Sequence, residues 1–252
     1  MNPFLQFFEA MGYAARMTVR AAGFLPTLPG QWDRVLDQAF RAGYRSVPIV
    51  AIMSVFIGGV LALSTAEGLK DNGLMDILGG ITGLGMAREL GPVMTAFLVA
   101  GRVGSAMTAE LGAMSVYQEV DALKSMNIPP ERCLVLPRIV AVLAVMPVLA
   151  AISIMMGWLG GALVAEFTTG LDLAPEIYWR YLRDWVDIVD MRAGLIKAEA
   201  FALAIVVIAC ALGLRTRGGP REIGTAVTRS VVVSMVAVLL LDYCLTKILL
   251  FT

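Results

Sequence analysis

The chain has 252 residues, of which 58% are hydrophobic and 16% are charged, and its mean hydropathy is +0.78. A soluble globular protein has about 45–50% apolar and about 25% charged residues, so this composition indicates an integral membrane protein. The 20 basic and 20 acidic residues cancel, and a chain without a basic excess does not fit nucleic-acid binding.

Several catalytic chemistries are excluded by residues and motifs that the sequence lacks. The chain contains no histidine, which excludes His-based general bases, Ser-His-Asp triads and most zinc sites, so no catalytic or metal residue is assigned. The sequence has no G-x-x-x-x-G-K-[ST] motif, so we do not expect it to hydrolyse ATP through a P-loop. The unpaired spacing of Cys133, Cys210 and Cys244 is typical of small hydrophobic residues, not of a disulfide framework.

Residues 1–45 are predicted to form amphipathic helices that lie in the membrane interface. In the segment Gln31–Arg45, apolar residues recur at helical spacing while charged residues occupy the other faces; the apolar set is Trp32, Val35, Leu36, Ala39 and Phe40. The Gly- and Pro-containing run 23–30 before this segment is typical of a turn.

Five membrane spans are predicted, within a single permease domain that covers residues 1–252. A span needs about 20 mostly apolar residues, and two of the segments contain no charged residue at all. The other three carry a few charged residues within long apolar runs. The predicted fold is therefore all-α, with N-terminal interfacial helices followed by five transmembrane helices at 46–66, 81–116, 139–165, 193–214 and 225–250.

The distribution of Lys and Arg predicts that the N-terminus is cytoplasmic. Five arginines precede the first span, and the loop 215–221 contains three more. The loop 166–190 has six acidic residues and two arginines. Because cytoplasmic loops carry the excess of basic residues, we expect 215–221 inside and 166–190 outside.

Small residues recur where membrane helices would approach closely. The second span has Gly101, Ser105, Ala109 and Ala113 at steps of four, and the third has Gly157 and Gly161. Such residues predict either close packing within one chain or the seam of a homodimer. The sequence does not decide between these alternatives.

The second span also contains ionisable residues. Arg88, Arg102 and Glu110 fall within roughly 80° of arc on a regular helix. Each charge costs roughly 2.5–3.5 kcal/mol at the middle of a membrane, so they need partners. We interpret Arg102 and Glu110 as structural intramembrane charges, either paired or close to the inner interface.

Three further charges are expected to meet. Given the predicted topology, Glu89, Lys197 and Asp242 lie on three different spans, each roughly 6–13 Å below the outer boundary. Three isolated charges at one depth are least costly when they contact one another. The cluster predicts a functional site, with the alternative that it only fixes the helix register.

The segment 119–128 between the second and third spans is predicted to be a short cytoplasmic helix that Pro129 ends. Its residues Val120, Leu123 and Met126 lie near one face. On these residues alone, an ordinary polar connector is favoured over a docking element for a separate ATPase.

These segments also carry a resemblance. The run ARELGPVMTAFLVAGRVGSAMTAELGAMSVYQEVDALKSMNIPPERCLVLPR, Ala87 to Arg138, resembles the signature stretch of MlaE/YrbE-type permeases. Agreement continues through GLIKAEAF, Gly194 to Phe201, and LLLDYCLT, Leu239 to Thr246. The resemblance therefore covers most of the chain.

The resemblance implies a lipid transporter of the bacterial inner membrane. The chain would be the multi-pass permease of an ABC transporter that moves phospholipid or a related lipid between the inner membrane and a periplasmic MCE-domain protein. The implied partners are a second copy of the chain, cytoplasmic ABC ATPase subunits that bind ATP-Mg, an MCE ring and, in some systems, a STAS-domain protein. The permease itself would need no cofactor.

The resemblance also implies roles for individual residues. Family lipid-site positions map onto Arg88, Glu89, Lys197 and Asp242, and the apolar neighbours expected at the lipid tails are Leu90, Met94, Phe97 and Leu98. The ATPase-coupling helix maps onto 119–126, with Val120, Leu123 and Met126 as the apolar face and Glu119, Asp121 and Lys124 at the rim.

Two other functions stay open at this point. The Glu89, Lys197 and Asp242 cluster also fits an ion-coupled secondary transporter. A membrane scaffold for the MCE ring, in which the charges are only structural, is the third hypothesis.

Overall fold

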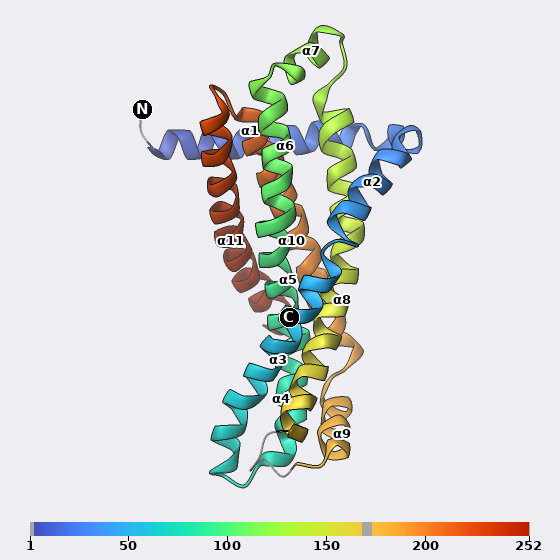
Figure 1. Cartoon of the computed structure of the whole chain (residues 1–252), viewed down its shortest axis with the longest axis vertical. Helices are drawn as coiled ribbons and strands as arrows, with labels where there is room; N and C mark the ends of the chain where they lie inside the picture. Colours follow the sequence, from blue (N-terminus) through green and yellow to red (C-terminus); the bar gives the residue numbers. More distant parts are fainter. Residues whose placement is uncertain (1–2, 168–172, 252) are drawn as a thin grey trace. The chain divides into compact units, whose positions relative to one another are not determined.

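The computed structural model describes residues 3–167 and 173–251, and every element in these ranges is a helix (Figure 1). The predicted all-α fold with five membrane-spanning helices is confirmed. The helical stretches that are long and apolar enough to cross a membrane are Leu25–Lys70, Met75–Val116, Glu131–Phe167, Ile188–Arg215 and Pro220–Leu249.

The first two spans differ in regularity. Helices α1 (Pro3–Gly23) and α2 (Trp32–Ala42) precede α3 (Val47–Lys70), which is a regular helix. The second span is interrupted twice by π-helical turns. In chain order it consists of α4 (Leu78–Gly85), the π turn Met86–Leu90, α5 (Gly91–Val99), the π turn Ala100–Gly104 and α6 (Ser105–Val116).

The remaining helices complete the bundle. The short helix α7 (Glu119–Ser125) follows the second span, and α8 (Leu136–Phe167) begins after a π turn at Glu131–Val135. Then come α9 (Pro175–Trp185), α10 (Ile188–Arg215) and α11 (Pro220–Phe251).

Two compact units make up the chain, and each is built from three separate segments. Unit 1 comprises Met1–Tyr44, Phe97–Val145 and Phe201–Leu241. Unit 2 comprises Arg45–Ala96, Met146–Ala200 and Asp242–Thr252.

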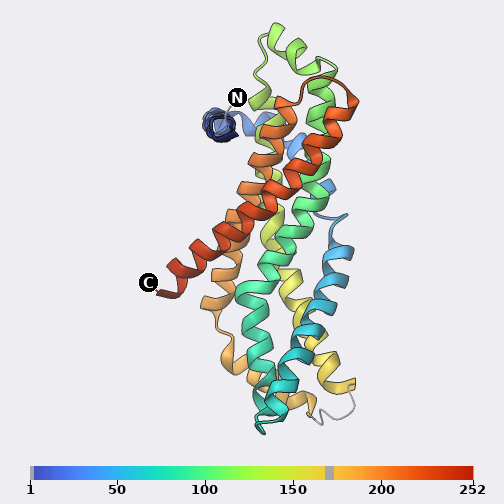
Figure 2. The ribbon, with the colours of Figure 1, turned by 90° about the vertical axis from the view of Figure 1, so that its left-hand side faces the viewer.

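In unit 1, α1 lies against the basic end of α10 and the π turn Glu131–Val135. Figure 1 shows α1 running across the direction of the spans, and Figure 2 shows it viewed along its axis. Two ion pairs hold the helix, Arg215 to Glu9 at 2.9 Å and Arg20 to Glu131 at 3.6 Å. The hydroxyl of Thr108 on α6 donates 2.9 Å to Ser230 on α11, so polar side chains also join the spans inside this unit.

In unit 2, glycines let α3 and α8 approach until their backbones touch. A Cβ atom on Gly58 would overlap the backbone of Gly157, and a Cβ atom on Gly160 would overlap the backbone of Val55. The hydroxyls of Ser54 and Ser153 form a hydrogen bond of 2.8 Å across the same pair of helices. Gly157 is thus used in packing within the chain, one of the two alternatives that the sequence left open.

The helix α9 occupies part of the segment expected to be an external loop. Its apolar side packs on α4, and its two buried residues, Tyr178 and Leu182, join a core cluster with Leu78 and Ala66. Pro175 at its first position and apolar residues four apart are helix signals within a run that also carries charges. Residues 168–172 lie outside the described part of the chain.

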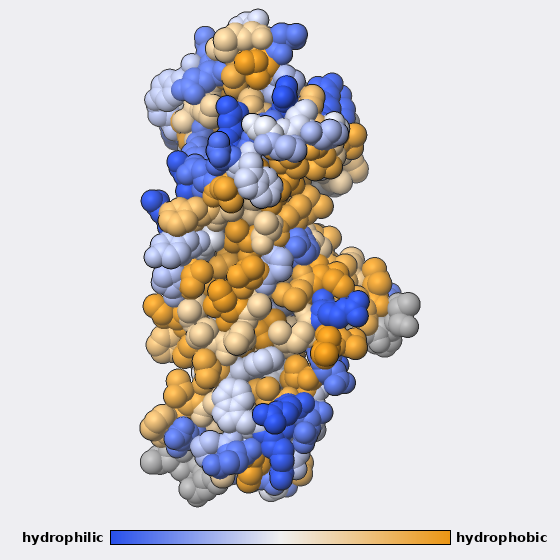
Figure 3. Space-filling model, turned by 90° about the vertical axis from the view of Figure 1, so that its right-hand side faces the viewer, coloured by the Kyte–Doolittle hydropathy of each residue, from blue (hydrophilic) through white to orange (hydrophobic). Residues whose placement is uncertain are grey.

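The surface of the bundle is apolar over wide areas. Figure 3 shows hydrophobic residues in broad continuous regions of one face. In unit 2, Phe56 of α3 is 68% exposed, which suits contact with lipid tails. On α2 the exposed apolar residues Trp32, Leu36 and Phe40 lie four residues apart on one side, as expected for an interfacial helix, although the membrane position of α1 and α2 stays a prediction.

Candidate functional site

The π turn Met86–Leu90 carries two of the predicted site residues, Arg88 and Glu89. A π turn inserts one extra residue into an α-helix, and such turns are frequent at functional sites. Gly194 of α10 lies so close to this turn that a Cβ atom there would overlap the carbonyl oxygen of Ala87. The close approach brings α10 within reach of both side chains.

Lys197 of α10 lies at the centre of a buried polar cluster, and its side chain is only 2% exposed. Its ammonium group donates 2.8 Å to Oε2 of Glu89, 3.0 Å to the carbonyl oxygen of Arg88 and 2.6 Å to the hydroxyl of Thr246. These three bonds use every donor that a lysine has. The buried charge is therefore fully hydrogen-bonded, as a buried ammonium must be.

Asp242 is the fourth partner of the same ammonium group. Its Oδ1 lies 3.1 Å from Nζ of Lys197 but accepts no hydrogen bond from the described residues. The three N–H groups of the lysine are already used by the other acceptors. The hydroxyl of Thr246 donates 3.2 Å to Glu89 and links the acid to α11. The structure thus brings together Glu89, Lys197 and Asp242 as the depth argument predicts, and adds Thr246, which the sequence reasoning missed.

Arg88 has a partner that the sequence reasoning did not find. Its Nε and Nη2 atoms both lie 2.6 Å from Oδ1 of Asp190, whose side chain is only 7% exposed. The other oxygen of Asp190 accepts 3.0 Å from the backbone N–H of Asp187, which fixes the carboxylate. Arg88 is nevertheless 39% exposed, so this anchored guanidinium still reaches the surface. Asp190 is one of the acidic residues of the expected external loop, and nothing in its sequence position distinguishes it from the others as a partner of Arg88.

Unit 2 also contains an apolar cavity that the last residue of this π turn helps to line. It has a volume of about 390 Å³ and is lined by Leu90 together with α3 residues, namely Met53, Phe56, Ile57, Val60, Leu61 and Ser64. Leu90 follows Arg88 by two residues, so a cationic group and an apolar hollow occur in one unit. Met94 is partly buried in the same unit, whereas Phe97 and Leu98 belong to unit 1 and are partly buried there.

The charges predicted to be structural lie in unit 1. Glu110 forms ion pairs with Arg138 at 3.0 Å and with Arg41 at 3.8 Å. Arg138 is 8% exposed and also donates 2.7 Å to the carbonyl oxygen of Leu134. Arg102 lies in the second π turn. Neither Arg138 nor Arg41 was singled out as a partner from the sequence.

The predicted coupling segment contains the helix α7. Residues with positive φ flank it, Gln118 at 62° and Asn127 at 58°, and these left-handed positions reverse the chain sharply. Val120 is buried against its own chain at 5% exposure, Leu123 is partly buried and Met126 is 61% exposed. The carboxylate of Asp121 accepts 2.8 Å from Lys124, and this bond holds the pKa of the carboxyl below its ordinary value.

The model of the family described as "Permease MlaE" matches residues 35–248. The chain belongs to the MlaE permease family. MlaE-family relatives include the intermembrane phospholipid transport system permease protein MlaE of Haemophilus influenzae, 36% identical over 246 residues that cover 97% of this chain and 94% of that protein.

Two other relatives come from photosynthetic organisms. A probable ABC transporter permease protein of Synechocystis is 33% identical over 225 residues, which are 88% of this chain and 85% of that one. The chloroplastic protein TRIGALACTOSYLDIACYLGLYCEROL 1 of Arabidopsis thaliana is 32% identical over 218 residues, which are 86% of this chain and 61% of that one. Membership of the MlaE family agrees with the five membrane-spanning helices.

Proposed function

We propose that the chain is the permease subunit of an ABC transporter that moves phospholipid, or a related lipid, between the bacterial inner membrane and a periplasmic MCE-domain protein. Membership of the MlaE permease family and the name of the Haemophilus relative support this function. The observation that carries it is the presence in one unit of the anchored, partly exposed Arg88 and of an apolar cavity lined by Leu90 of the same π turn. A phospholipid needs this combination, because it joins an anionic phosphate to apolar tails.

Arg88 is the residue proposed to meet the phosphate. Asp190 engages its Nε and Nη2 atoms and fixes the plane of the guanidinium. The remaining donors can bind a phosphate oxygen through a charge-assisted hydrogen bond. Leu90 and the cavity it lines would then receive part of a lipid tail, with Met94 of the same unit as a further tail contact. Phe97 and Leu98 belong to unit 1, and their contact with a tail stays a prediction from the resemblance.

Glu89 and Asp242 have a different role, because carboxylates repel phosphate. We infer that they hold Lys197 in place and so fix the π turn that presents Arg88. Thr246 contributes to the same network through α11. Movement of α11 relative to the turn would change these contacts, which gives the cluster a way to release a headgroup.

The power for transport is proposed to come from a separate cytoplasmic ATPase that holds ATP-Mg, since this chain has no P-loop. The contact is assigned to α7. Because Val120 is buried against its own chain, the exposed Met126 and the partly buried Leu123 supply the apolar surface, with Glu119, Asp121 and Lys124 around them. An MCE ring on the periplasmic side and a STAS-domain protein on the ATPase are the further proposed partners.

We infer a cytoplasmic N-terminus from the distribution of Lys and Arg along the sequence. We also infer a homodimer, from the small residues that recur on the second span. In unit 1, no described atom lies within 4 Å of a Cβ atom built on Gly101, and Ser105, Ala109 and Ala113 are only partly buried. This row of small residues on the second span stays open, whereas Gly157 and Gly161 pack within unit 2. The open row supports a helix–helix contact with a second copy.

An ion-coupled secondary transporter is not favoured. The buried cluster by itself suits either mechanism, but the family match and the relatives named as ABC transporter permeases favour the ATP-driven one. A secondary carrier purified without partners would move its substrate down an ion gradient.

The test uses the assembled transporter and measures both the bound lipid and the copurified ATPase. Arg88→Ala should lower the amount of bound phospholipid and leave ATPase assembly intact, while Lys70→Ala on the exposed end of α3 serves as the control. Glu89→Lys should reduce lipid transfer more than Glu89→Gln, because it puts a second ammonium group next to Lys197. If all these variants bind and transfer lipid like the parent, the cluster is structural and the proposed function loses its site.

A further inference from the structure

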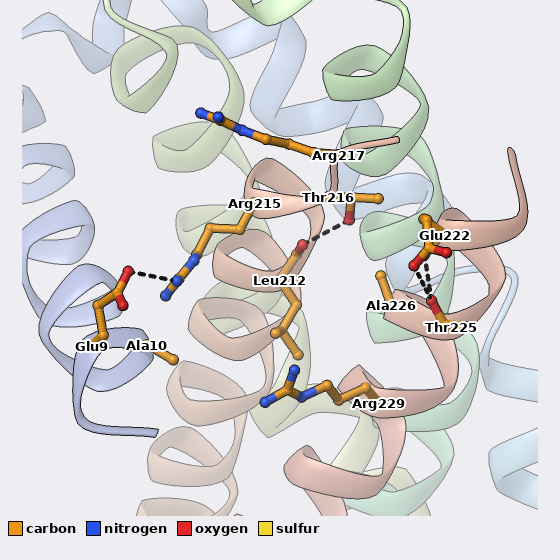
Figure 4. A pocket seen from close by; sticks show the side chains of 10 residues that line it. All are labelled: Glu9, Ala10, Leu212, Arg215, Thr216, Arg217, Glu222, Thr225, Ala226 and Arg229. Carbon is orange, nitrogen blue, oxygen red and sulfur yellow. Dashed lines mark hydrogen bonds and ion pairs between the residues drawn. The ribbon is translucent and has the colours of Figure 1, made fainter. Parts of the chain in front are cut away.

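A second cavity lies in unit 1, where α10 ends and α11 begins. It has a volume of about 490 Å³. Its polar lining comes from three elements, and Figure 4 shows the side chains around it. α1 contributes Glu9, the end of α10 contributes Arg215, and the residues that follow contribute Thr216, Arg217, Glu222, Thr225 and Arg229.

Arg215 is held in position by two contacts, but one of its nitrogen atoms is buried without a hydrogen-bond partner among the described residues. Its Nη2 donates 2.9 Å to Glu9, and its guanidinium lies over the ring of Tyr13 at 5.5 Å from the centroid. Its Nη1 is buried and has no hydrogen-bond partner among the described residues. An unsatisfied buried donor is costly, so an acceptor from outside the chain would be bound favourably here.

Two more arginines add positive charge to this cavity. Within the described residues, the guanidinium groups of Arg217 and Arg229 form no hydrogen bond or ion pair, and in Figure 4 both side chains extend toward the side of the cavity where α1 lies. Glu9 is engaged by Arg215, and Glu222 accepts 3.3 Å from Thr225. The lining therefore has three guanidinium groups and two carboxylates, which leaves one uncompensated positive charge.

An apolar groove continues from this cavity along α11. The groove has a volume of about 590 Å³ and shares Thr225 and Arg229 with the first cavity. Val232 and Val233 line it and are 55% and 36% exposed. Arg229 and Val233 are one helical turn apart, so the cationic end and the apolar groove share one side of α11.

We propose that this end of α10 and α11 binds an anionic membrane phospholipid, with its phosphate among Arg215, Arg217 and Arg229 and an acyl chain along Val232 and Val233. A free phosphate would need the polar cavity alone, whereas the adjoining apolar groove calls for a ligand that carries a tail. The site is in unit 1 and is separate from the proposed transport site in unit 2. With the proposed orientation it belongs to the cytoplasmic leaflet, where juxtamembrane arginines attract anionic lipids.

The test is photo-crosslinking in vesicles of phosphatidylcholine that contain a small fraction of phosphatidylglycerol with a photoreactive acyl chain. The full chain is reconstituted, irradiated and mapped by mass spectrometry. We expect adducts on the peptide that contains Val232 and Val233, and about a fivefold loss of labelling for each of Arg217→Gln and Arg229→Gln. Arg34→Gln on the exposed face of α2, which removes the same charge elsewhere in unit 1, should label like the parent.

Two further measurements distinguish a lipid headgroup from free phosphate and a lost charge from a misfolded variant. Arg229→Lys keeps the charge and should retain more labelling than Arg229→Gln. Labelling of the two Gln variants at the parental level overturns the proposal, and so does competition by inorganic phosphate that equals competition by unlabelled phosphatidylglycerol. Adducts near Leu90 report on the transport site independently, so that failure of either proposal is recognised without the other.

Discussion

Lys197 is a buried ionisable side chain of unit 2 that has four partners, three hydrogen-bond acceptors and the carboxylate of Asp242. Replacement by methionine keeps the apolar stem and removes the charge. Glu89 and Asp242 would then face each other without a cation. Breaking a buried ion pair by removing one partner costs about 3–5 kcal/mol, so we expect Lys197→Met to unfold at a clearly lower temperature than the parent.

Thermal unfolding of the purified chain in detergent measures this effect. Lys70→Met, on the exposed end of α3, should leave the unfolding temperature within a degree or two of the parental value. Adding Glu89→Gln and Asp242→Asn to Lys197→Met removes the unpaired charges and should recover part of the loss. Equal stability of Lys197→Met and the parent would show that the cluster contributes nothing to folding.

At the scale of helices, the contact between α3 and α8 depends on glycine. A Cβ atom on Gly58 meets the backbone of Gly157, which cannot rotate away as a side chain could. Overpacking of this kind typically costs about 1–3 kcal/mol, so Gly58→Ala should lower the unfolding temperature. Gly68→Ala is the matched control, since no described atom lies within 4 Å of its Cβ position and alanine favours the helix there. The prediction is wrong if both variants are equally stable.

The helix α7 offers a test of coupling. Burying a leucine side chain is worth roughly 1.5–3 kcal/mol, and a carboxylate at the same place would be buried without a partner. We expect Leu123→Asp to release the ATPase or to uncouple its turnover from lipid transfer, and Leu123→Met to behave like the parent. Copurification of the ATPase and the rate of lipid transfer measure the two effects. Normal values of both for Leu123→Asp would exclude α7 as the coupling element.

The sequence predicted the elements better than their irregularities. Long charge-free runs predict spans with little ambiguity, and the shared depth of Glu89, Lys197 and Asp242 was enough to predict that they meet. The π turn that carries Arg88 and Glu89 could not be predicted, because no residue type marks the extra residue of such a turn. Asp190 and Thr246 could not be predicted either, because their contacts join residues far apart in the chain and no sequence pattern marks such a pair.

The membrane topology is testable on the whole molecule. Single cysteines at Glu176 on α9 and at Gly219 before α11 should react with a membrane-impermeant thiol reagent from opposite sides, after the three native cysteines have been replaced. Gly219 suits this purpose better than Gly218, whose φ of 110° favours glycine. Labelling of both positions from the same side would contradict the predicted orientation.

The homodimer is tested on the open row of small residues. Ala109→Leu adds bulk to a partly buried position of α6, and we expect a larger monomer fraction when the protein is sized in mild detergent. Gly12→Leu on α1 is a control outside this row, because no described atom lies within 4 Å of its Cβ position. A parental protein that is strictly monomeric under these conditions would rule the dimer out.

The π turn at Met86–Leu90 also restricts which insertions and deletions the coding sequence can tolerate. It behaves as a single inserted residue, and each residue turns an α-helix by about 100°. Deleting one residue there would restore a regular helix, yet it would rotate Arg88 and Glu89 relative to everything that follows. A substitution in this stretch changes one side chain, whereas the in-frame loss of one codon would displace Arg88 and Glu89 together from their partners Asp190 and Lys197. Insertions and deletions should be rarer in this short segment than in the regular α-helical parts of the second span.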